Sequence, residues 1–146
     1  MPKSARSSLE VVDLGRMAFA EALAYQNELR DARLSGNGGD VVLLVEHPDV
    51  ITLGRATRET SVPHSDAELE RAGYAVHRVN RGGDVAYHGA GQLVGYPILD
   101  LSTRGRDVHR YLRQLEDVLI DTAADFGVAA QRRPGFTGVW IDERHK

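Results

Sequence analysis

The sequence contains no cysteine, which excludes several kinds of chemistry within its 146 residues. Disulfide bonds, thiolate metal ligands and a cysteine nucleophile are all ruled out inside this stretch of chain. Lysine is almost absent too, since Lys3 and Lys146 are the only two, and arginine carries nearly all the positive charge. The formal net charge of −3 provides no overall basic field and argues against a nucleic-acid partner.

Long apolar runs are also missing. None approaches the roughly 18 residues that a membrane-spanning helix needs, so we expect no membrane segment. The first residues, MPKSARSS, have no apolar stretch behind their basic residues, which argues against a secretory signal. We therefore expect a flexible tail over 1–8, one domain over 9–146 and a cytoplasmic location.

Strand-like and helical patterns alternate along the chain. Strands are predicted at 9–14, 40–47, 50–54, 74–80, 93–101 and at the end of 129–141, and helices at 15–34, just after Ser65, and at 107–127. The fold class is therefore α/β (α+β), with a mixed sheet flanked by helices, because several strands follow one another too closely for helical crossovers. The end, GVWIDERHK, resembles one strand and the turn of a hairpin without its partner strand, so we expect a chain truncated at its C-terminus.

The segment from Arg81 to Gln92 is rich in glycine and is punctuated by an arginine, a tyrosine, a histidine and a glutamine. Glycines allow positive φ and close approach of a ligand, so the segment suits a tight wall around a ligand. The alternative is an ordinary connection between two strands. His88 is either a general base or a histidine that orders the loop. The segment matches neither a P-loop nor a dinucleotide fingerprint.

Three motifs resemble those of one enzyme family, the lipoyl(octanoyl) transferases. RGGDVAYHGAGQLVGYPILDL is similar to the family's RGGxxTYHGPGQLVxYPIxDL, and EHPDVITLGR, from Glu46 to Arg55, resembles its EHPPVYTLGR. PGFTGVWI, ahead of Lys146, resembles the strand that leads into the family's K-I-A-x-I-G segment. One departure is Ala90, which stands where the family has proline.

The resemblance implies the mixed-sheet catalytic core shared by biotin and lipoate protein ligases. It also implies that one segment forms the substrate-binding wall, namely Arg81, Gly82, Gly83, Asp84, Val85, Ala86, Tyr87 and His88. Lys146 stands where the family has the lysine that lowers the pKa of its nucleophilic cysteine. That cysteine lies some thirty residues further on in the family, beyond this chain.

The implied reaction moves an octanoyl or lipoyl group from acyl carrier protein to a lysine of a lipoyl domain through a cysteine acyl-enzyme. The implied acceptors are the lipoyl domains of 2-oxoacid dehydrogenase subunits and the glycine cleavage H protein, and no cofactor or metal is expected. Because acyl carrier protein is acidic, arginines are candidates for docking it, against the alternative of a solvated face. These are Arg104, Arg106, Arg110, Arg113, Arg132 and Arg133.

Two alternatives stay open. The first is an ATP-dependent lipoate or biotin protein ligase of the same superfamily. The second is a catalytically inert acyl-binding fragment, because the chain as given has no cysteine. By itself, the 146-residue chain is expected to be inactive.

Overall fold

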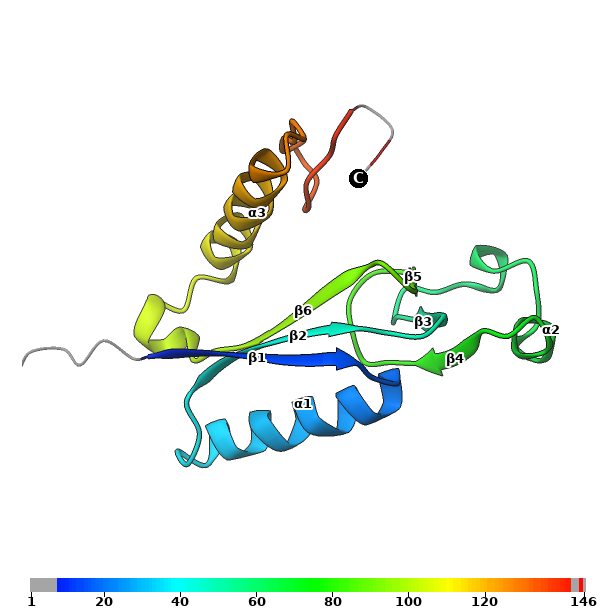
Figure 1. Cartoon of the computed structure of the whole chain (residues 1–146), viewed down its shortest axis with the longest axis horizontal. Helices are drawn as coiled ribbons and strands as arrows, with labels where there is room; N and C mark the ends of the chain where they lie inside the picture. The colour runs from blue at the N-terminus through cyan, green and yellow to red at the C-terminus, as the bar shows by residue number, and fades with distance from the viewer. Residues whose placement is uncertain (1–7, 143–144, 146) are drawn as a thin grey trace, which may run out of the picture. The chain divides into compact units, whose positions relative to one another are not determined.

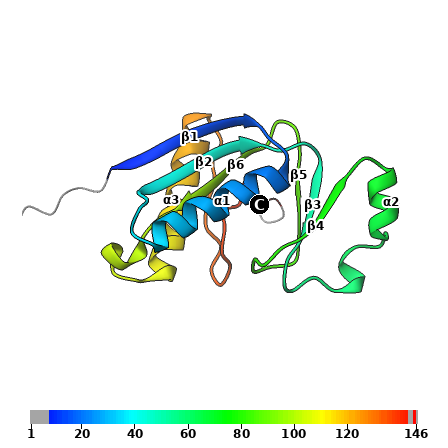
Figure 2. The ribbon, with the colours of Figure 1, turned by 90° about the horizontal axis from the view of Figure 1, so that it is seen from below.

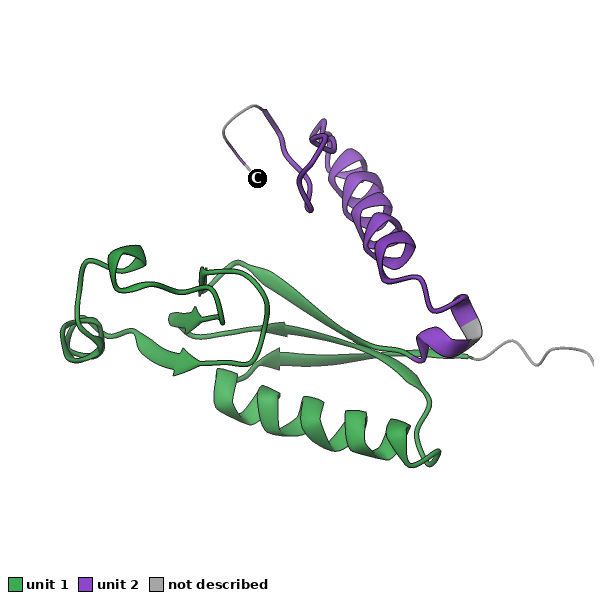
Figure 3. Ribbon diagram, turned by 180° about the vertical axis from the view of Figure 1, so that it is seen from behind, with its two compact units in different colours: residues 1–99 green, residues 100–146 purple. Residues whose placement is uncertain are grey.

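The computed structural model describes residues 8–142 and 145 and divides into two compact units (Figures 1 and 3). Unit 1 extends to Leu99 and unit 2 begins at Asp100. The flexible tail expected over 1–8 lies, apart from Ser8, outside the described residues, and so does Lys146. The single domain over 9–146 stays a prediction.

Unit 1 contains a three-stranded mixed sheet, called sheet A, in the order β1-β2-β6. Strand β1 (Leu9–Arg16) runs parallel to β2 (Asp40–Glu46), and β2 runs antiparallel to β6 (Leu93–Ile98). The β-branched and leucine residues of β2 favour this central position. Its register places Glu46 opposite Leu93.

Helix α1 (Phe19–Leu34) provides the crossover between the parallel strands β1 and β2 and lies along one face of sheet A (Figures 1 and 2). Phe19 and Ala22 on the helix are buried, as are Val41, Leu43 and Val45 on β2. The alternation along β2 therefore turns these three residues toward the helix. This packing forms the core of unit 1.

A second mixed sheet, sheet B, has the order β4-β3-β5. Strand β3 (Val50–Leu53) runs parallel to β4 (Ala75–Arg78) and antiparallel to β5 (Val85–His88). Figure 2 shows this sheet beyond one end of sheet A, with α2 at its outer side. Because β2 leads into β3 through only three residues, His47 to Asp49, the corner between them joins the two sheets directly.

The connection from β3 to β4 contains a short 3-10 turn, η1 (Glu59–Ser61), and helix α2 (Asp66–Arg71). The helix predicted just after Ser65 is confirmed. It begins with a capping box, in which the Ser65 side chain accepts from the Glu68 N–H and the Glu68 carboxylate accepts from the Ser65 N–H. This reciprocal pair satisfies donors that the helix itself cannot satisfy.

Unit 2 consists of the 3-10 turn η2 (Leu101–Arg104), helix α3 (Val108–Asp125) and a loop that folds back on the helix. Asp107 caps α3 by accepting from the Arg110 N–H at 2.9 Å. Beyond the helix, Gln131 and Trp140 exchange two backbone hydrogen bonds of 2.8 Å, which closes the loop.

Glu116 on α3 fastens this loop. Its side chain is only 3% exposed, and its carboxylate accepts from the Gly138 N–H at 2.8 Å, from Arg113 at 2.7 Å and from Arg132 at 2.8 Å. The Gly138 N–H, followed by the two guanidinium groups, lowers the pKa of Glu116 to about 2. A carboxylate on a helix thus holds three groups from the helix and the following loop.

The α/β class with mixed sheets and flanking helices is confirmed, although the strands form two sheets and not one. The strand β5 was missed, because its residues lie within the glycine-rich segment and read as loop. The strand expected at the end of 129–141 is wrong. The structure describes all of these residues, and the pairing among them is a single bridge between Gln131 and Trp140. Among the described helices, none is both long enough and apolar enough to cross a membrane.

Replacing Glu116 with glutamine should reveal its contribution through the pH dependence of unfolding. A carboxyl group whose pKa is lowered on folding stabilises the fold above its ordinary pKa, 4.5, and this contribution fades as pH falls toward about 2. We expect Glu116→Gln to be less stable at neutral pH and to lack this part of the acid destabilisation. Chemical unfolding across that pH range measures the difference. The exposed Glu10→Gln on β1 is the control, and an equal loss in both variants would contradict the role of Glu116.

Candidate functional site

The glycine-rich segment lies against the end of β3, and the two are joined backbone to backbone. The N–H groups of Gly54, Arg55 and Ala56 donate to the carbonyls of Asp84, Arg81 and Gly83, each at 3.0 Å. A Cβ atom at Gly54 would lie 2.5 Å from the Gly83 carbonyl oxygen. Only glycine at this position lets the two backbones approach so closely.

Arg81 secures the same junction from its side chain. Its guanidinium donates to the Thr52 carbonyl at 2.7 Å and to the Thr52 hydroxyl at 2.9 Å. Gly82 and Gly83 are exposed in the turn that follows, where Gly83 adopts a φ of +80°. Asp84 accepts from the Ser61 hydroxyl at 2.7 Å. Arg81 and Asp84 thus hold the turn in place and leave the two glycines at the surface.

Strand β5 divides the remaining residues of the predicted wall between the two faces of sheet B. Ala86 and His88 pair with Thr52 and Val50, whereas Val85 and Tyr87 lie on the opposite face. Tyr87 is 51% exposed. Its hydroxyl donates to Asp49 at 2.7 Å, which raises the pKa of Tyr87. The side chains of the predicted wall therefore do not all face one ligand.

The face with Ala86 and His88 adjoins a cluster of aromatic rings and histidines. His47 is fully buried, donating from Nδ1 to the Met17 carbonyl at 2.8 Å and accepting at Nε2 from the Tyr96 hydroxyl at 2.9 Å. Its ring centroid lies 6.0 Å from that of His88 and 5.5 Å from that of Phe19. Burial raises the pKa of Tyr96, which keeps its hydroxyl protonated and able to donate. His88 thus lies beside a fixed, fully hydrogen-bonded histidine.

The wall ends in a tight turn from His88 to Gln92. The Gln92 N–H donates to the Gly89 carbonyl at 3.1 Å, and His88 Nδ1 donates to Gln92 Oε1 at 2.5 Å. Gly89 is buried, and a Cβ atom there would lie 2.6 Å from Asp49 Oδ1 and would overlap the Tyr87 hydroxyl. Gly91 has a φ of +81°. The turn therefore depends on glycine for space at one position and for backbone conformation at another.

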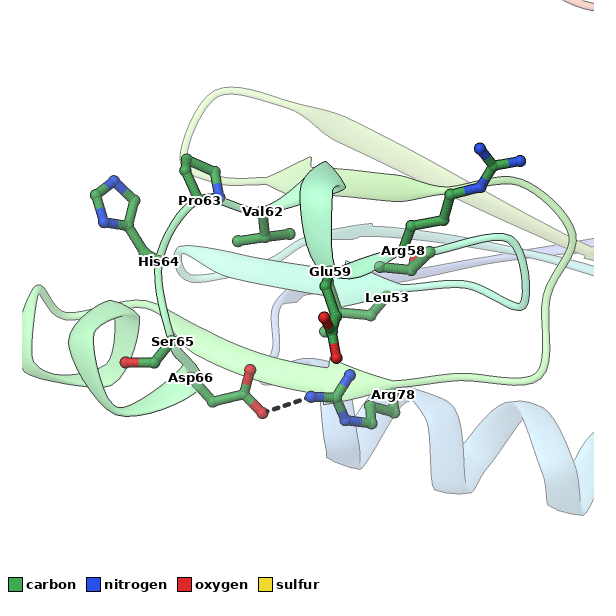
Figure 4. Close-up of a pocket in the computed structure, with 10 residues that line it drawn as sticks. Leu53, Arg58, Glu59, Val62, Pro63, His64, Ser65, Asp66 and Arg78 are labelled. Atoms are coloured by element: carbon green, nitrogen blue, oxygen red, sulfur yellow. Dashed lines mark hydrogen bonds and ion pairs between the residues drawn. The ribbon is translucent and has the colours of Figure 1, made fainter.

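A pocket of about 520 Å³ opens between the ends of β3 and β4 and the connection through η1 and α2 (Figure 4). Its apolar lining residues are Leu53, Val62 and Pro63, and the others are polar or charged. Arg78 forms an ion pair with Asp66 at 2.9 Å, and Figure 4 shows His64 and Arg58 pointing away from that pair. Because an alkyl chain is best buried by apolar side chains, we assign no acyl site to this pocket.

The described residues contain no group of three or more histidine or acidic side chains arranged to hold a metal ion. Of the arginines considered for docking an acidic partner, Arg113 and Arg132 are both bound to Glu116. Arg133 stacks over Phe136 and Trp140, with its guanidinium carbon 5.1 and 5.8 Å from the two ring centroids.

Sequence reasoning missed the residues that contact the wall or the turn at its end, among them Glu46, His47, Asp49 and Thr52. All four belong to EHPDVITLGR, the second of the three motifs that carried the resemblance. The motif therefore contained the signal, but which of its side chains contact the wall depends on strand register.

Comparison with known proteins shows which family the chain is similar to. Residues 18–145 match the profile of the lipoyl protein ligase A/B catalytic domain. The octanoyltransferase of Solibacter usitatus is 53% identical over 131 residues, which are 90% of this chain and 60% of that protein. The octanoyltransferase of Geobacter metallireducens is 51% identical over 130 residues, 89% of this chain and 58% of that protein. The chain thus spans about 60% of the length of these curated relatives.

Solved structures support the fold. A lipoate-protein ligase A bound with ATP superposes with a TM-score of 0.67 at 14% identity, over 91% of this chain and 52% of that one. A bi-partite lipoate protein ligase from Thermoplasma acidophilum gives 0.62 at 15% identity, over 96% of this chain and 53% of that one. The ligase-like core implied by the sequence resemblance is therefore confirmed. The profile match covers most of the chain, and the chain belongs to the lipoyl protein ligase A/B catalytic domain family.

Proposed function

We propose that this chain is part of an octanoyltransferase, which moves an octanoyl group from acyl carrier protein to a lysine of a lipoyl domain. The observation that carries the proposal is the identity of 53% to a curated octanoyltransferase over 90% of the chain. The ATP-bound ligase resembles the chain in fold alone, at 14% identity. This difference in similarity favours the transferase over an ATP-dependent ligase.

The proposed chemistry has two steps. A cysteine thiolate attacks the carbonyl carbon of the octanoyl thioester, a new thioester forms on the enzyme, and the carrier protein's thiol leaves. The amine of the acceptor lysine then attacks this thioester, forms an amide and releases the cysteine thiol, while the amine gives up a proton. Because the chain has no cysteine, the nucleophile must be supplied from outside these residues.

Residues Arg81 to His88 form the proposed substrate-binding wall. Gly82 and Gly83 leave backbone exposed, so a ligand can approach the chain without meeting a side chain. Arg81 and Asp84 are occupied within the protein, with Thr52 and Ser61 respectively. Their part in the wall is therefore to shape the turn. His88, beside His47, presents the polar end of the wall.

The same proposal gives Lys146 the role of lowering the pKa of the cysteine, because a nearby ammonium group favours a thiolate. The proposed acceptors are the lipoyl domains of 2-oxoacid dehydrogenase subunits and the glycine cleavage H protein. The proposed location is the cytoplasm.

A chimera tests the function directly. We expect no octanoyl transfer by the 146-residue chain itself, since it has no cysteine. When the chain replaces the matching portion of the Solibacter usitatus octanoyltransferase, the chimera should acylate a lipoyl domain from octanoyl acyl carrier protein without ATP. Mass spectrometry of the acceptor measures the transfer. Cysteine-independent transfer by the chain would contradict the mechanism, and a strict requirement for ATP would favour the ligase.

Gly83→Val in this chimera should lower transfer much more than it lowers stability. A β-branched residue is strained at a φ of +80° and would place methyl groups where a ligand approaches. Gly73→Val is the matched control, because Gly73 also has positive φ, +95°, and no atom lies within 4 Å of its would-be Cβ. We expect similar decreases in melting temperature, but a loss of transfer of about tenfold or more only for Gly83→Val. Equal losses of activity would show that the turn is merely structural.

Lys146→Ala in the chimera should slow acylation of the enzyme at neutral pH. Without the ammonium group the pKa of the cysteine rises, so less thiolate is present, and the rate should recover partly as pH increases. Lys146→Arg should restore little activity, because a guanidinium keeps the charge but cannot exchange a proton. Single-turnover acylation measured against pH tests both variants. Profiles like that of the unmodified chimera would remove Lys146 from the mechanism.

A further inference from the structure

Two carboxylates, Glu46 at the end of β2 and Asp49 just before β3, each contact the segment from Tyr87 to Gly91, where the wall leads into its final turn. Glu46 Oε2 accepts from the Gly91 N–H at 3.0 Å. Asp49 Oδ1 accepts from the Tyr87 hydroxyl at 2.7 Å. Hydrogen bonds to ionised acceptors are about twice as strong as neutral ones. The segment from Tyr87 to Gly91 is therefore hydrogen-bonded at both of its ends to carboxylates from one short stretch of chain, Glu46 to Asp49.

Strand register explains why these two residues reach the turn. Glu46 is paired with Leu93 in sheet A, so Gly91 lies two residues before its partner. Val50 is paired with His88 in sheet B, which places Asp49 next to Gly89, two residues after Tyr87. Each carboxylate thus makes a diagonal contact across an antiparallel pair, a distance that a polar side chain can span.

The corner itself is rigid, which allows it to act as a reference for the turn. His47, between the two acidic residues, is fully buried with both ring nitrogens hydrogen-bonded. Pro48 follows it and has a fixed φ. A displacement of the backbone that carries the two acidic residues would therefore require a buried histidine to move.

We propose that Glu46 and Asp49 are positioning residues, which hold the Tyr87–Gly91 segment in the conformation that binds the acyl substrate. The inference rests on the proposed function. Neither residue needs to touch the substrate: each acts through the turn, by fixing the backbone at Gly91 and the ring of Tyr87. Their loss should therefore weaken substrate binding more than it slows the chemical step.

The first test compares substitutions at Glu46 in the chimera. Glu46→Ala removes the acceptor for the Gly91 N–H and should raise KM for octanoyl acyl carrier protein about tenfold, with little change in kcat. Glu46→Gln keeps a carbonyl oxygen at the same place and should restore most of the affinity. Asp13→Ala is the matched control on β1, because the Asp13 carboxylate also accepts from a glycine N–H, that of Gly15 at 2.8 Å, where φ is +58°. It should leave KM unchanged.

Hydrogen exchange on the 146-residue chain provides a readout that does not depend on activity. The peptide that contains Gly91 should exchange faster in Glu46→Ala than in the unmodified chain, and at the unmodified rate in Asp13→Ala. If exchange increases while KM stays constant, the positioning role is overturned and the proposed function stands. A glutamine variant as defective as the alanine variant would also overturn it. If the unmodified chimera transfers no octanoyl group, the proposed function itself fails.

The second test examines the other end of the turn. Asp49→Ala and Tyr87→Phe remove the two halves of one hydrogen bond, so the double variant should raise KM no more than either single variant. Additive increases in KM would show that the two residues act separately and would overturn the assignment of Asp49.

Discussion

The position of the candidate site depends on the contact between the end of β3 and the glycine-rich segment. Three backbone hydrogen bonds join Gly54, Arg55 and Ala56 to the segment that begins at Arg81. They form only because Gly54 has no side chain, since a Cβ atom would lie 2.5 Å from a carbonyl oxygen. With the backbones in contact, the Arg81 guanidinium reaches Thr52, and β5 can pair with β3. The position of the wall therefore follows from one glycine outside it.

The elements with strong periodicity could be predicted from the sequence. The apolar spacing of α3, the capping box of α2 and the continuous apolar run of β2 each depend on local sequence, and all three are found. The strand β5 could not be predicted in this way, because glycines on both sides of VAYH conceal it. What makes it a strand is its pairing with β3, a contact between residues more than thirty positions apart. The last strand shows the opposite case. The β-branched pattern near Trp140 is typical of a strand, but Trp140 finds only one bridge partner among the described residues, Gln131, so no strand forms.

The candidate site shows the same division between local and distant causes. Glycine content indicated the turns on both sides of β5, since Gly83 and Gly91 both adopt positive φ. The division of the wall between two faces could have been expected from alternation once β5 was known. The two supporting residues, Glu46 and Asp49, could not have been expected from the sequence, because they reach the wall and its turn through the registers of two different sheets. A linear motif indicates that such residues matter together, but it does not show which atoms meet.

The hydrogen bonds that hold this turn also bear on the departure at Ala90. Where the resembling family has proline, the fixed φ of that residue restricts the turn before it folds. Alanine does not restrict it in this way, so the folded protein must hold the turn through contacts. Here the Gln92 N–H closes it onto the Gly89 carbonyl, and Glu46 holds the Gly91 N–H just after the alanine. The entropy that proline would have removed from the unfolded chain is thus offset by hydrogen bonds in the folded one. The alanine therefore makes the turn depend more strongly on Glu46 than a proline at the same position would.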